Sequence, residues 1–194
     1  MPEIIGLMGV IGSGKNYQQE LLVKKGFIAL DFKDALIDMC EDIVGYKIRD
    51  HYEDFKICIV GTTHGGFNKG LTPTQHQLAQ YPNIMTGRRL LQRVGTEVMR
   101  KRDPDYWVDA WCAKCKDYIL GGHSVVSADV RFRNEARAIV LGGKALEVPT
   151  KIIFNDYKSD RYDAKSTHES EYLAQKLLDK GLKDGDEVTL EMLD

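Results

Sequence analysis

A glycine-rich loop near the start of the chain limits most strongly what this sequence can fold into. Residues 9–15 read G-V-I-G-S-G-K and follow a short apolar run at 4–8. Helix-forming residues from 15 to 25 come next and end at Gly26. A strand, a glycine-rich turn and a helix in this order gather backbone N–H groups and a helix N-terminus at one point, where phosphate oxygens can bind. The sequence therefore predicts a phosphate-binding loop.

The residue types within this loop suit that task. Glycines at three positions let backbone N–H groups turn toward an anion, and the ammonium of Lys15 can reach the β- and γ-phosphates of ATP. Asn16 stands where such loops carry Ser or Thr as a Mg²⁺ ligand. Its amide oxygen can ligate the cation directly or through water, or it can remain solvated on the helix. We expect ATP to be bound by Gly9, Gly12, Ser13, Gly14, Lys15 and Asn16.

The rest of the chain alternates between strand-like and helix-like segments, which favours an α/β fold with helices packed on a parallel sheet. The pattern predicts strands at 27–30, 124–128, 145–148 and 152–154, and helices at 35–44, 88–102, 106–120, 134–141 and 170–179. The helix at 134–141 is expected to stop at Gly142 and Gly143. A length of 194 residues predicts a single domain spanning 1–194, with an irregular insertion at 46–85.

Composition narrows the class of protein. Hydrophobic residues make up 43% of the chain, which is enough for a sizeable core. The 27 Lys and Arg residues are outnumbered by 29 Asp and Glu, which disfavours a basic nucleic-acid-binding protein. No run of apolar residues is long enough to span a membrane, and the first residues lack the basic and apolar regions of a signal peptide. We therefore expect a cytoplasmic protein without a nucleic-acid or membrane partner.

Two of the four cysteines, Cys112 and Cys115, form a C-x-x-C pair inside the helix predicted at 106–120. Such a pair can be a redox centre or half of a zinc site. A zinc site needs two further ligands, and the sequence has no second pair at zinc-binding spacing. We interpret the pair as reduced thiols near the core-facing side of the helix.

A basic segment at 86–102 carries six Lys and Arg side chains against one Glu, which suits a small anionic ligand better than a long polyanion. Arg88 and Gln92 share one face of the predicted helix. There an arginine could clamp a phosphate, and an amide one turn away could read a base edge. A solvated basic helix face is the alternative interpretation.

The same predicted helix carries Leu90, Val94 and Val98 at helical spacing, and all three are expected to be buried. Gly95 lies among them. A glycine inside a helix costs about 1 kcal/mol relative to alanine, so its presence predicts close approach by a ligand or by another backbone.

A second segment, at 125–132, reads as a strand that ends in Asp129 and Arg131. Ligands of open α/β sheets bind outside the carboxyl ends of the strands. A carboxylate there can hold Mg²⁺ through water, and an arginine there can stabilise the charge of a transferring phosphate. A surface ion pair in a strand-to-helix turn is the alternative.

In chain order, these segments resemble motifs of the deoxynucleoside monophosphate kinases encoded by tailed bacteriophages. That family looks like a glycine-rich loop followed by F-A-D-x-L-K, R-x-L-L-Q-x-x-G-T-E, a W-V pair, D-V-R-F-x-N-E and H-x-S-E. This chain carries corresponding residues at 9–15, 32–36, 88–97, 107–108, 129–135 and 168–171. It departs from the family pattern at Asn16, Tyr17, Lys33, Ile37 and Arg133, where the family has Asp, Thr, Ala, Lys and Pro.

The resemblance implies a P-loop NTPase fold: a parallel sheet flanked by helices, a monophosphate-binding insertion at 46–85 and a lid at 155–168. It implies transfer of a phosphoryl group from ATP, with Mg²⁺, to a deoxynucleoside 5′-monophosphate in the host cytoplasm, and it leaves a homodimer open. Two alternatives remain. One is a dephospho-coenzyme A kinase, which has a similar loop, and the other is a nucleotide-binding regulator without turnover.

Carried over position by position, the resemblance also assigns site residues. The expected catalytic residues are Lys15, Arg88, Arg131 and Arg161. The expected substrate-binding residues are Lys33, Asp34, Arg88, Gln92, Gly95, Trp107, Asp129 and Arg131. Mg²⁺ is expected at Asn16 and Asp129, directly or through water. By residue type alone, Trp107 would instead be a core anchor.

Overall fold

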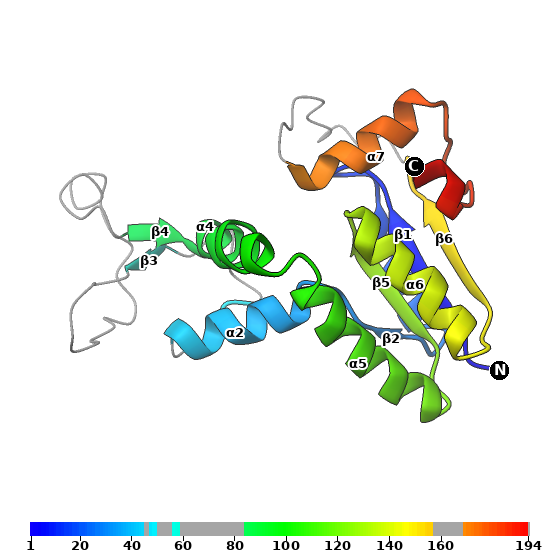
Figure 1. Ribbon diagram of the computed structural model, residues 1–194, viewed down its shortest axis with the longest axis horizontal. Helices are drawn as coiled ribbons and strands as arrows, with labels where there is room; N and C mark the ends of the chain where they lie inside the picture. The colour runs from blue at the N-terminus through cyan, green and yellow to red at the C-terminus, as the bar shows by residue number, and fades with distance from the viewer. Residues whose placement is uncertain (45–46, 50–55, 59–83, 157–168, 194) are drawn as a thin grey trace. The chain divides into compact units, whose positions relative to one another are not determined.

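The computed structural model describes residues 1–44, 47–49, 56–58, 84–156 and 169–193 (Figure 1). The chain divides into two compact units. The first unit comprises Met1–Lys33 and Trp107–Asp194, and the second comprises Asp34–Tyr106. Each unit contains its own cluster of buried apolar side chains.

The first unit is built around a four-stranded, all-parallel sheet. Its strands are β1 (Ile4–Met8), β2 (Ile28–Ala29), β5 (Val125–Val130) and β6 (Thr150–Phe154), in the spatial order β2-β5-β1-β6. Strand β1 is buried at every residue and pairs with β5 on one side and β6 on the other. Parallel strands covered on both faces typically read as continuous apolar runs, as β1 does. The predicted α/β class with a parallel sheet is confirmed.

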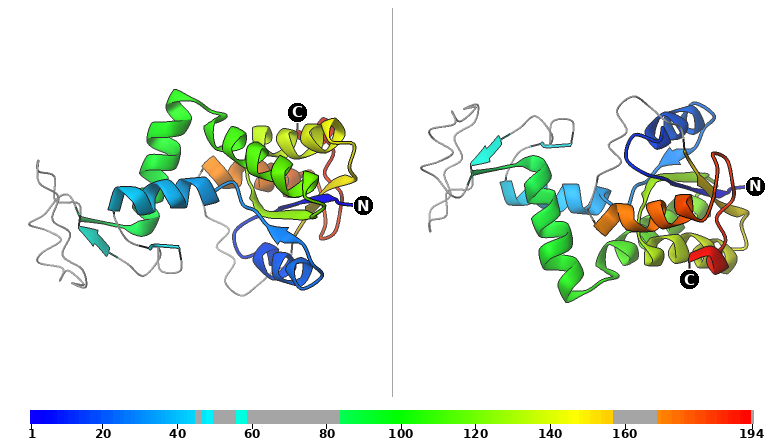
Figure 2. Two further views of the ribbon diagram at one scale, coloured as in Figure 1. Left: turned by 90° about the horizontal axis from the view of Figure 1, so that it is seen from below. Right: turned by 90° about the horizontal axis from the view of Figure 1, so that it is seen from above.

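Helices cover both faces of this sheet (Figure 2). On one face lies α1 (Lys15–Val23), whose Leu22 packs against side chains of β1 and β5. On the other face lie α5 (Tyr106–Leu120), α6 (Arg133–Ala145) and α7 (Glu169–Asp179), which share the larger core. The helices that follow the neighbouring strands β1 and β5 therefore lie on opposite faces.

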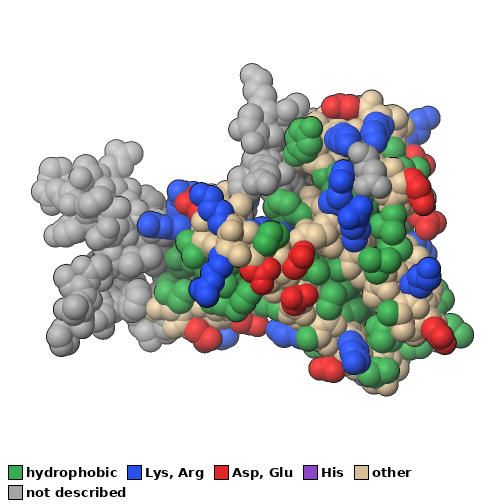
Figure 3. All heavy atoms as spheres, in the orientation of Figure 1, with side chains coloured by type: hydrophobic (Ala, Val, Ile, Leu, Met, Phe, Trp, Pro, Cys, Tyr) green, Lys and Arg blue, Asp and Glu red, His purple; other side chains and the backbone are tan. Residues whose placement is uncertain are grey.

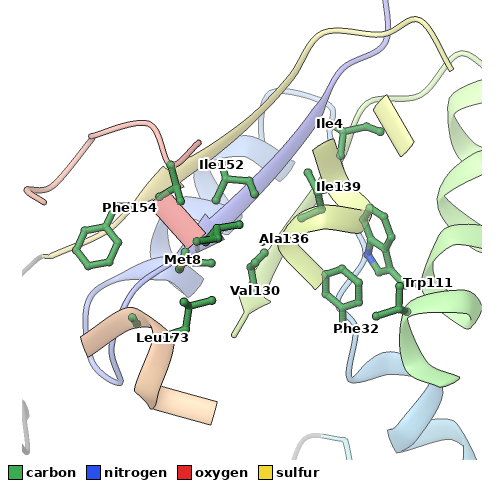
Figure 4. Close-up of a cluster of buried hydrophobic side chains, with 14 of the residues drawn as sticks. Ile4, Met8, Phe32, Trp111, Val130, Ala136, Ile139, Ile152, Phe154 and Leu173 are labelled. Atoms are coloured by element: carbon green, nitrogen blue, oxygen red, sulfur yellow. The ribbon is translucent and has the colours of Figure 1, made fainter. Parts of the chain in front are cut away.

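The larger core also fixes the segment that follows β2 (Figure 4). Ile4 and Met8 of β1 belong to this core. The ring of Phe32 stacks on Trp111 of α5 with centroids 4.6 Å apart, and the indole Nε1 of Trp111 donates a hydrogen bond of 2.8 Å to the carbonyl of Leu30. An indole N–H in a core needs such a partner, so this contact anchors the end of β2 on α5.

The cysteine pair lies where the sequence predicted it. Cys115 is buried in the larger core and Cys112 packs against that core, both on α5. Burial raises the pKa of the Cys115 thiol to about 12, which disfavours the reactive thiolate. Trp107, on the same helix, is also buried, with 2% of its surface exposed.

In its described residues, the second unit has two α-helices and a helical segment with a wider turn. These are α2 (Asp34–Val44), α4 (Gly87–Gln92) and the π-helix η1 (Arg93–Arg100). Strands β3 (Lys56–Cys58) and β4 (Ile84–Thr86) pair antiparallel. Among the residues of this unit whose placement the structure gives, Ile37, Cys40, Val44, Ile48 and Leu90 form a buried apolar cluster.

One expectation about this unit was wrong. Leu90 is buried and Val94 is partly buried, but Val98 is 52% exposed. The reason is that residues 93–100 form a π-helix rather than the predicted continuation of an α-helix. Hydrogen bonds from i to i+5 place more residues in each turn, so a spacing of four residues drifts away from the buried face.

Two expectations about the first unit were also wrong. Helix α6 does not stop at Gly142 and Gly143 but continues to Ala145, and residues 145–148 form no strand. Gly143 is a close-packing position, since a Cβ there would lie 1.7 Å from Oγ1 of Thr150 in β6. Tertiary packing of α6 on β6 thus overrides the tendency of glycine to end a helix.

Several predicted features lie largely or wholly outside the described residues. Of the insertion at 46–85, the structure describes 47–49, 56–58 and the first two residues of β4; of the lid at 155–168, it describes only residues 155 and 156. Arg161 lies outside the described residues. Among the helices that are described, none is both long and apolar enough to cross a membrane.

Candidate functional site

The topology of the first unit marks one edge of the sheet as a ligand site. Neighbouring strands β1 and β5 send their connections to opposite faces, α1 on one and α6 on the other. In open parallel sheets, ligands bind at such a switch point, outside the carboxyl ends of the strands. The glycine-rich loop at 9–14 leaves β1 here, and residues 131–132 leave β5.

Lys15 is the first residue of α1, and its side chain turns back into the loop. Its Nζ donates hydrogen bonds to the carbonyl oxygens of Gly9 at 2.6 Å and Val10 at 2.7 Å, and to Oγ of Ser13 at 3.3 Å. Lys15 is only 9% exposed. The loop therefore encloses a buried cation at the N-terminus of a helix, where the partial positive charge of the helix also favours an anion.

Gly9 shows why this loop needs glycine at its first position. A Cβ on Gly9 would lie 2.2 Å from the backbone oxygen of Asn155 and 2.5 Å from Oγ of Ser13. The backbone N–H of Asn155 donates to the carbonyl of Met8 at 2.7 Å, which holds Asn155 beside the loop. Asn155 is 3% exposed, and in the described part of the chain its Oδ1 has no hydrogen-bond partner.

Asp129, near the end of β5, is 4% exposed and uses both carboxylate oxygens. Oδ1 accepts hydrogen bonds from the backbone N–H of Phe32 at 2.9 Å and from Oγ of Ser127 at 3.1 Å. Oδ2 accepts the backbone N–H of Lys33 at 2.9 Å. The pKa of the Asp129 carboxyl is raised to about 7, chiefly by burial and also by the Asp31 carboxylate, while the ammonium of Lys33 acts to lower it. Asp129 thus holds the segment that follows β2.

Asp31 lies beside Asp129, at the end of the neighbouring strand β2. Its Oδ1 accepts hydrogen bonds from Nε2 of Gln19 in α1 at 2.9 Å and from the backbone N–H of Ala128 in β5 at 2.7 Å. Its Oδ2 lies 2.9 Å from the ammonium of Lys33. Two strand ends and one helix are therefore joined through a single carboxylate.

Glu135 shapes the turn that carries Arg131. The carboxylate of Glu135 is buried and accepts the backbone N–H of Arg131 at 2.8 Å and of Phe132 at 3.0 Å. These bonds satisfy backbone donors at the start of α6, as an N-terminal cap does. Arg131 is partly exposed at this edge of the sheet.

The two residues expected to hold Mg²⁺ differ in how well they suit a metal. Asn16 is exposed in the first turn of α1, so its amide oxygen is accessible. Asp129 already accepts three hydrogen bonds out of about four that a carboxylate can accept. This donor set suits a contact through water and does not suit direct ligation by Asp129. Among the described residues, no group of three or more His, Cys, Asp and Glu side chains is arranged to hold a metal ion.

In the second unit, Asp34 is paired with a residue that no sequence motif singled out. The guanidinium of Arg49 contacts Oδ1 of Asp34 at 2.5 Å and Oδ1 of Asp38 at 3.1 Å. Glu41 accepts the backbone N–H groups of Ile48 and Arg49 at 2.8 and 3.1 Å, which holds this segment against α2. An ion pair with Arg49 therefore fixes the position of the Asp34 side chain. Arg49 lies in a segment whose sequence shows neither helical nor strand periodicity.

Arg88 and Gln92 lie one turn apart on α4, where Arg88 is exposed and Gln92 partly exposed. Gly95 follows in η1 and is buried; a Cβ there would lie 2.6 Å from Cδ2 of Leu36 in α2. The sequence predicted close approach to Gly95 by a ligand or another backbone; the group that approaches it in the structure is instead the side chain of Leu36.

The structure places Lys15, Lys33, Asp129 and Arg131 in the first unit, at or just after the carboxyl ends of its strands β1, β2 and β5. Asp34, Arg88, Gln92 and Gly95 belong to the second unit. The sequence analysis missed four residues that shape these sites. The missed residues are Gln19, Asp31, Arg49 and Glu135. Of these, only Glu135 had a local signal, because an acidic residue in the first turn of a helix indicates a cap.

The buried carboxyl of Asp129 makes stability depend on pH. Its pKa in the folded state is about 7, above the ordinary value near 4. The folded protein therefore binds a proton here more tightly than the unfolded chain does. The resulting gain in the free energy of unfolding is complete below about pH 4 and is lost as the pH rises toward 7. On lowering the pH from 7.5 to 5.5, we expect the wild type to gain about 1–2 kcal/mol relative to Asp129→Asn.

Urea unfolding of both proteins at the two pH values measures this difference. Titrating groups remote from residue 129 are shared by the two proteins and cancel, so the difference reports on Asp129 and the charged groups beside it. An equal response to pH in both would contradict the raised pKa of Asp129.

No family model matches this chain, and no curated protein sequence matches it. The fold and the edge described above define an α/β protein with a four-stranded parallel sheet and a lysine-containing, glycine-rich loop at its switch point.

Proposed function

We propose that this protein has a P-loop NTPase fold and transfers a phosphoryl group from ATP to a deoxynucleoside 5′-monophosphate, giving the diphosphate and ADP. The observation that supports it most is the place of Lys15. A buried ammonium is held by loop carbonyls at a helix N-terminus, directly after the central strand β1 and at the switch point of the sheet. Phosphate oxygens are the ligand that such a loop suits best.

Phosphoryl transfer requires positioning and neutralisation of charge rather than a covalent protein intermediate. In this proposal, Lys15 exchanges its carbonyl contacts for phosphate oxygens, while the N–H groups of the loop bind the same oxygens. Arg131, whose backbone is held by Glu135, supplies a second charge from the end of β5. Mg²⁺ carried by ATP would neutralise phosphate charge, with Asn16 as a ligand and Asp129 contacting it through water.

The identity of the second substrate rests on the motif resemblance, whose longest motif, at 88–97, lies in the second unit. Arg88 is exposed and can offer a planar fork to a monophosphate, and Gln92 one turn away can offer its amide to a base. Figure 3 shows both acidic and basic side chains on the visible face of the first unit, a mixture that does not favour a long polyanion. We propose Asp34 as a further substrate-binding residue, and 155–168 with Arg161 as a lid that excludes water. Trp107 is 2% exposed, which favours the role of a buried anchor over that of a substrate contact.

A coupled assay of ADP release tests the function. The full chain is given MgATP with each of the four deoxynucleoside monophosphates, and separately with dephospho-coenzyme A. Turnover with a monophosphate supports the proposal, and turnover with dephospho-coenzyme A alone would replace it. ATP binding without turnover on any of these acceptors would instead indicate a nucleotide-binding regulator.

If Arg88 binds the phosphate of the monophosphate with its guanidinium, even a conservative change at this position should lower the activity. In Arg88→Lys, a point charge replaces a planar fork that matches two phosphate oxygens. We expect kcat/KM for the monophosphate to fall about tenfold or more, while the affinity for ATP alone stays within about twofold.

Arg89→Lys is the matched control, because Arg89 is the next residue of α4 and forms an ion pair with Glu97. It should leave both quantities close to those of the wild type. Equal losses for ATP and for the monophosphate in Arg88→Lys would point to a structural role of Arg88.

A further inference from the structure

We propose that Asp31 is a positioning residue that holds Lys33 as a second fixed cation at the phosphate-binding edge of the sheet. The ligand of this cation is a phosphate group of the nucleotide, so the inference rests on the proposed function and deepens it. The juxtaposition that carries it is the 2.9 Å contact between Lys33 Nζ and Oδ2 of Asp31, at the strand end beside Asp129.

The position of the Asp31 carboxylate is set by the framework of the first unit. Asp31 is 9% exposed, and its Oδ1 accepts hydrogen bonds from Gln19 in α1 and from the backbone of Ala128 in β5. Gln19 lies one helical turn after Lys15, so the same helix that presents the loop lysine also orients Asp31. A carboxylate bound from two separate elements has little freedom to turn away.

Lys33 is held at both ends. Its backbone N–H donates to Oδ2 of Asp129 at 2.9 Å, and its ammonium contacts Asp31. A free lysine side chain loses rotamer entropy when a ligand fixes it. Because Asp31 fixes Lys33 in advance, less of that cost falls on binding. The side chain of Lys33 remains 34% exposed, so an anion from solvent can reach it.

Charge explains why this edge needs Lys33. Asp31 and Asp129 place two carboxyl groups at neighbouring strand ends, and their interaction already raises the pKa of Asp129. Two carboxylates without a cation would repel an incoming phosphate. The ammonium of Lys33 contacts the Asp31 carboxylate and lowers the pKa of Asp129. Its positive charge therefore offsets the negative charge of both carboxylates at the place where the phosphate would bind.

The test is a double-mutant cycle on phosphate binding, with inorganic tripolyphosphate as the probe and titration calorimetry as the measurement. The proteins are the wild type, Asp31→Asn, Lys33→Met and the double variant. We expect Lys33→Met to weaken binding about tenfold, the loss of one charge-assisted contact. Asp31→Asn should weaken binding severalfold in the wild type but not further in Lys33→Met, because Asp31 acts through Lys33.

A merely structural role of Asp31 gives a different result: Asp31→Asn would then weaken binding equally in both backgrounds, which would overturn the inference. Lys25→Met is the matched control, since Lys25 is an exposed lysine just after α1, and it should leave binding unchanged. If Lys25→Met weakened tripolyphosphate binding as much as Lys33→Met does, the effect of Lys33 would come from the net charge of the protein alone. That result would also overturn the inference.

A second measurement needs no change at Asp31. In protein labelled with ¹⁵N-lysine, the Nζ signal of Lys33 is assigned by its loss in Lys33→Met and should shift when tripolyphosphate is added. An unchanged signal would overturn the inference even if Asp31→Asn fails to fold. Neither measurement depends on turnover, so tripolyphosphate binding that depends on Lys33 stands even if no monophosphate is phosphorylated.

Discussion

Lys15→Ala is expected to lower kcat for phosphoryl transfer by about 10²–10³-fold, the effect of removing one preorganised charge at a reacting phosphate. The ammonium of Lys15 is the buried cation of the loop, and its nearest partners are carbonyl oxygens that it can exchange for phosphate oxygens. The substitution also leaves the carbonyls of Gly9 and Val10 without this donor. We therefore expect a simultaneous loss of about 1–3 kcal/mol in the free energy of unfolding.

Two measurements separate these effects. ADP release under saturating substrates gives kcat, and urea unfolding gives the stability of the same preparation. Lys24→Ala, at the exposed C-terminal end of α1, is the control and should change neither by much. A kcat of Lys15→Ala within threefold of the wild-type value would contradict the proposal that this loop binds ATP.

Gly9→Ala is expected to cost about 3 kcal/mol or more in the free energy of unfolding. The added methyl would lie 2.2 Å from the backbone oxygen of Asn155. No rotation of a side chain relieves this contact, because the obstacle is a backbone carbonyl and the N–H of Asn155 is bound to Met8. Overpacking of a rigid site typically costs about 1–3 kcal/mol, and a backbone clash lies at or beyond the upper end. We also expect ATP binding to be lost, since β1 must shift away from Asn155.

Gly26→Ala isolates the contribution of the backbone dihedral. Gly26 has a φ of 96°, and a Cβ there would meet nothing within 4 Å. This control should cost only about 1–2 kcal/mol, the strain of placing alanine at positive φ. If Gly9→Ala is no more destabilising than Gly26→Ala, the close approach of Asn155 to the loop is incorrect.

The strongest local patterns in the sequence predicted the elements best. The helix expected at 106–120 is α5 within the same bounds, and those expected at 35–44 and 170–179 begin one residue earlier as α2 and α7. Each has apolar residues at helical spacing over at least ten positions. The strand at 4–8 is an uninterrupted apolar run and was predicted without error. Local propensity and the buried pattern agree in these segments, so no tertiary contact has to override them.

The sequence alone determined that a glycine-rich loop ending in Lys15 lies between a buried strand and a helix, because spacing and residue type suffice for that. Only the tertiary structure decided what surrounds it. Asp31 joins Gln19 to Ala128 across separations in the chain that no periodicity reports, and the carboxylate held in this way contacts Lys33 two residues further on. The extension of α6 through Gly143 and the exposure of Val98 likewise depend on packing and on helix type. Local preferences act over a few residues, whereas a site is assembled from strand ends that the sheet order brings together.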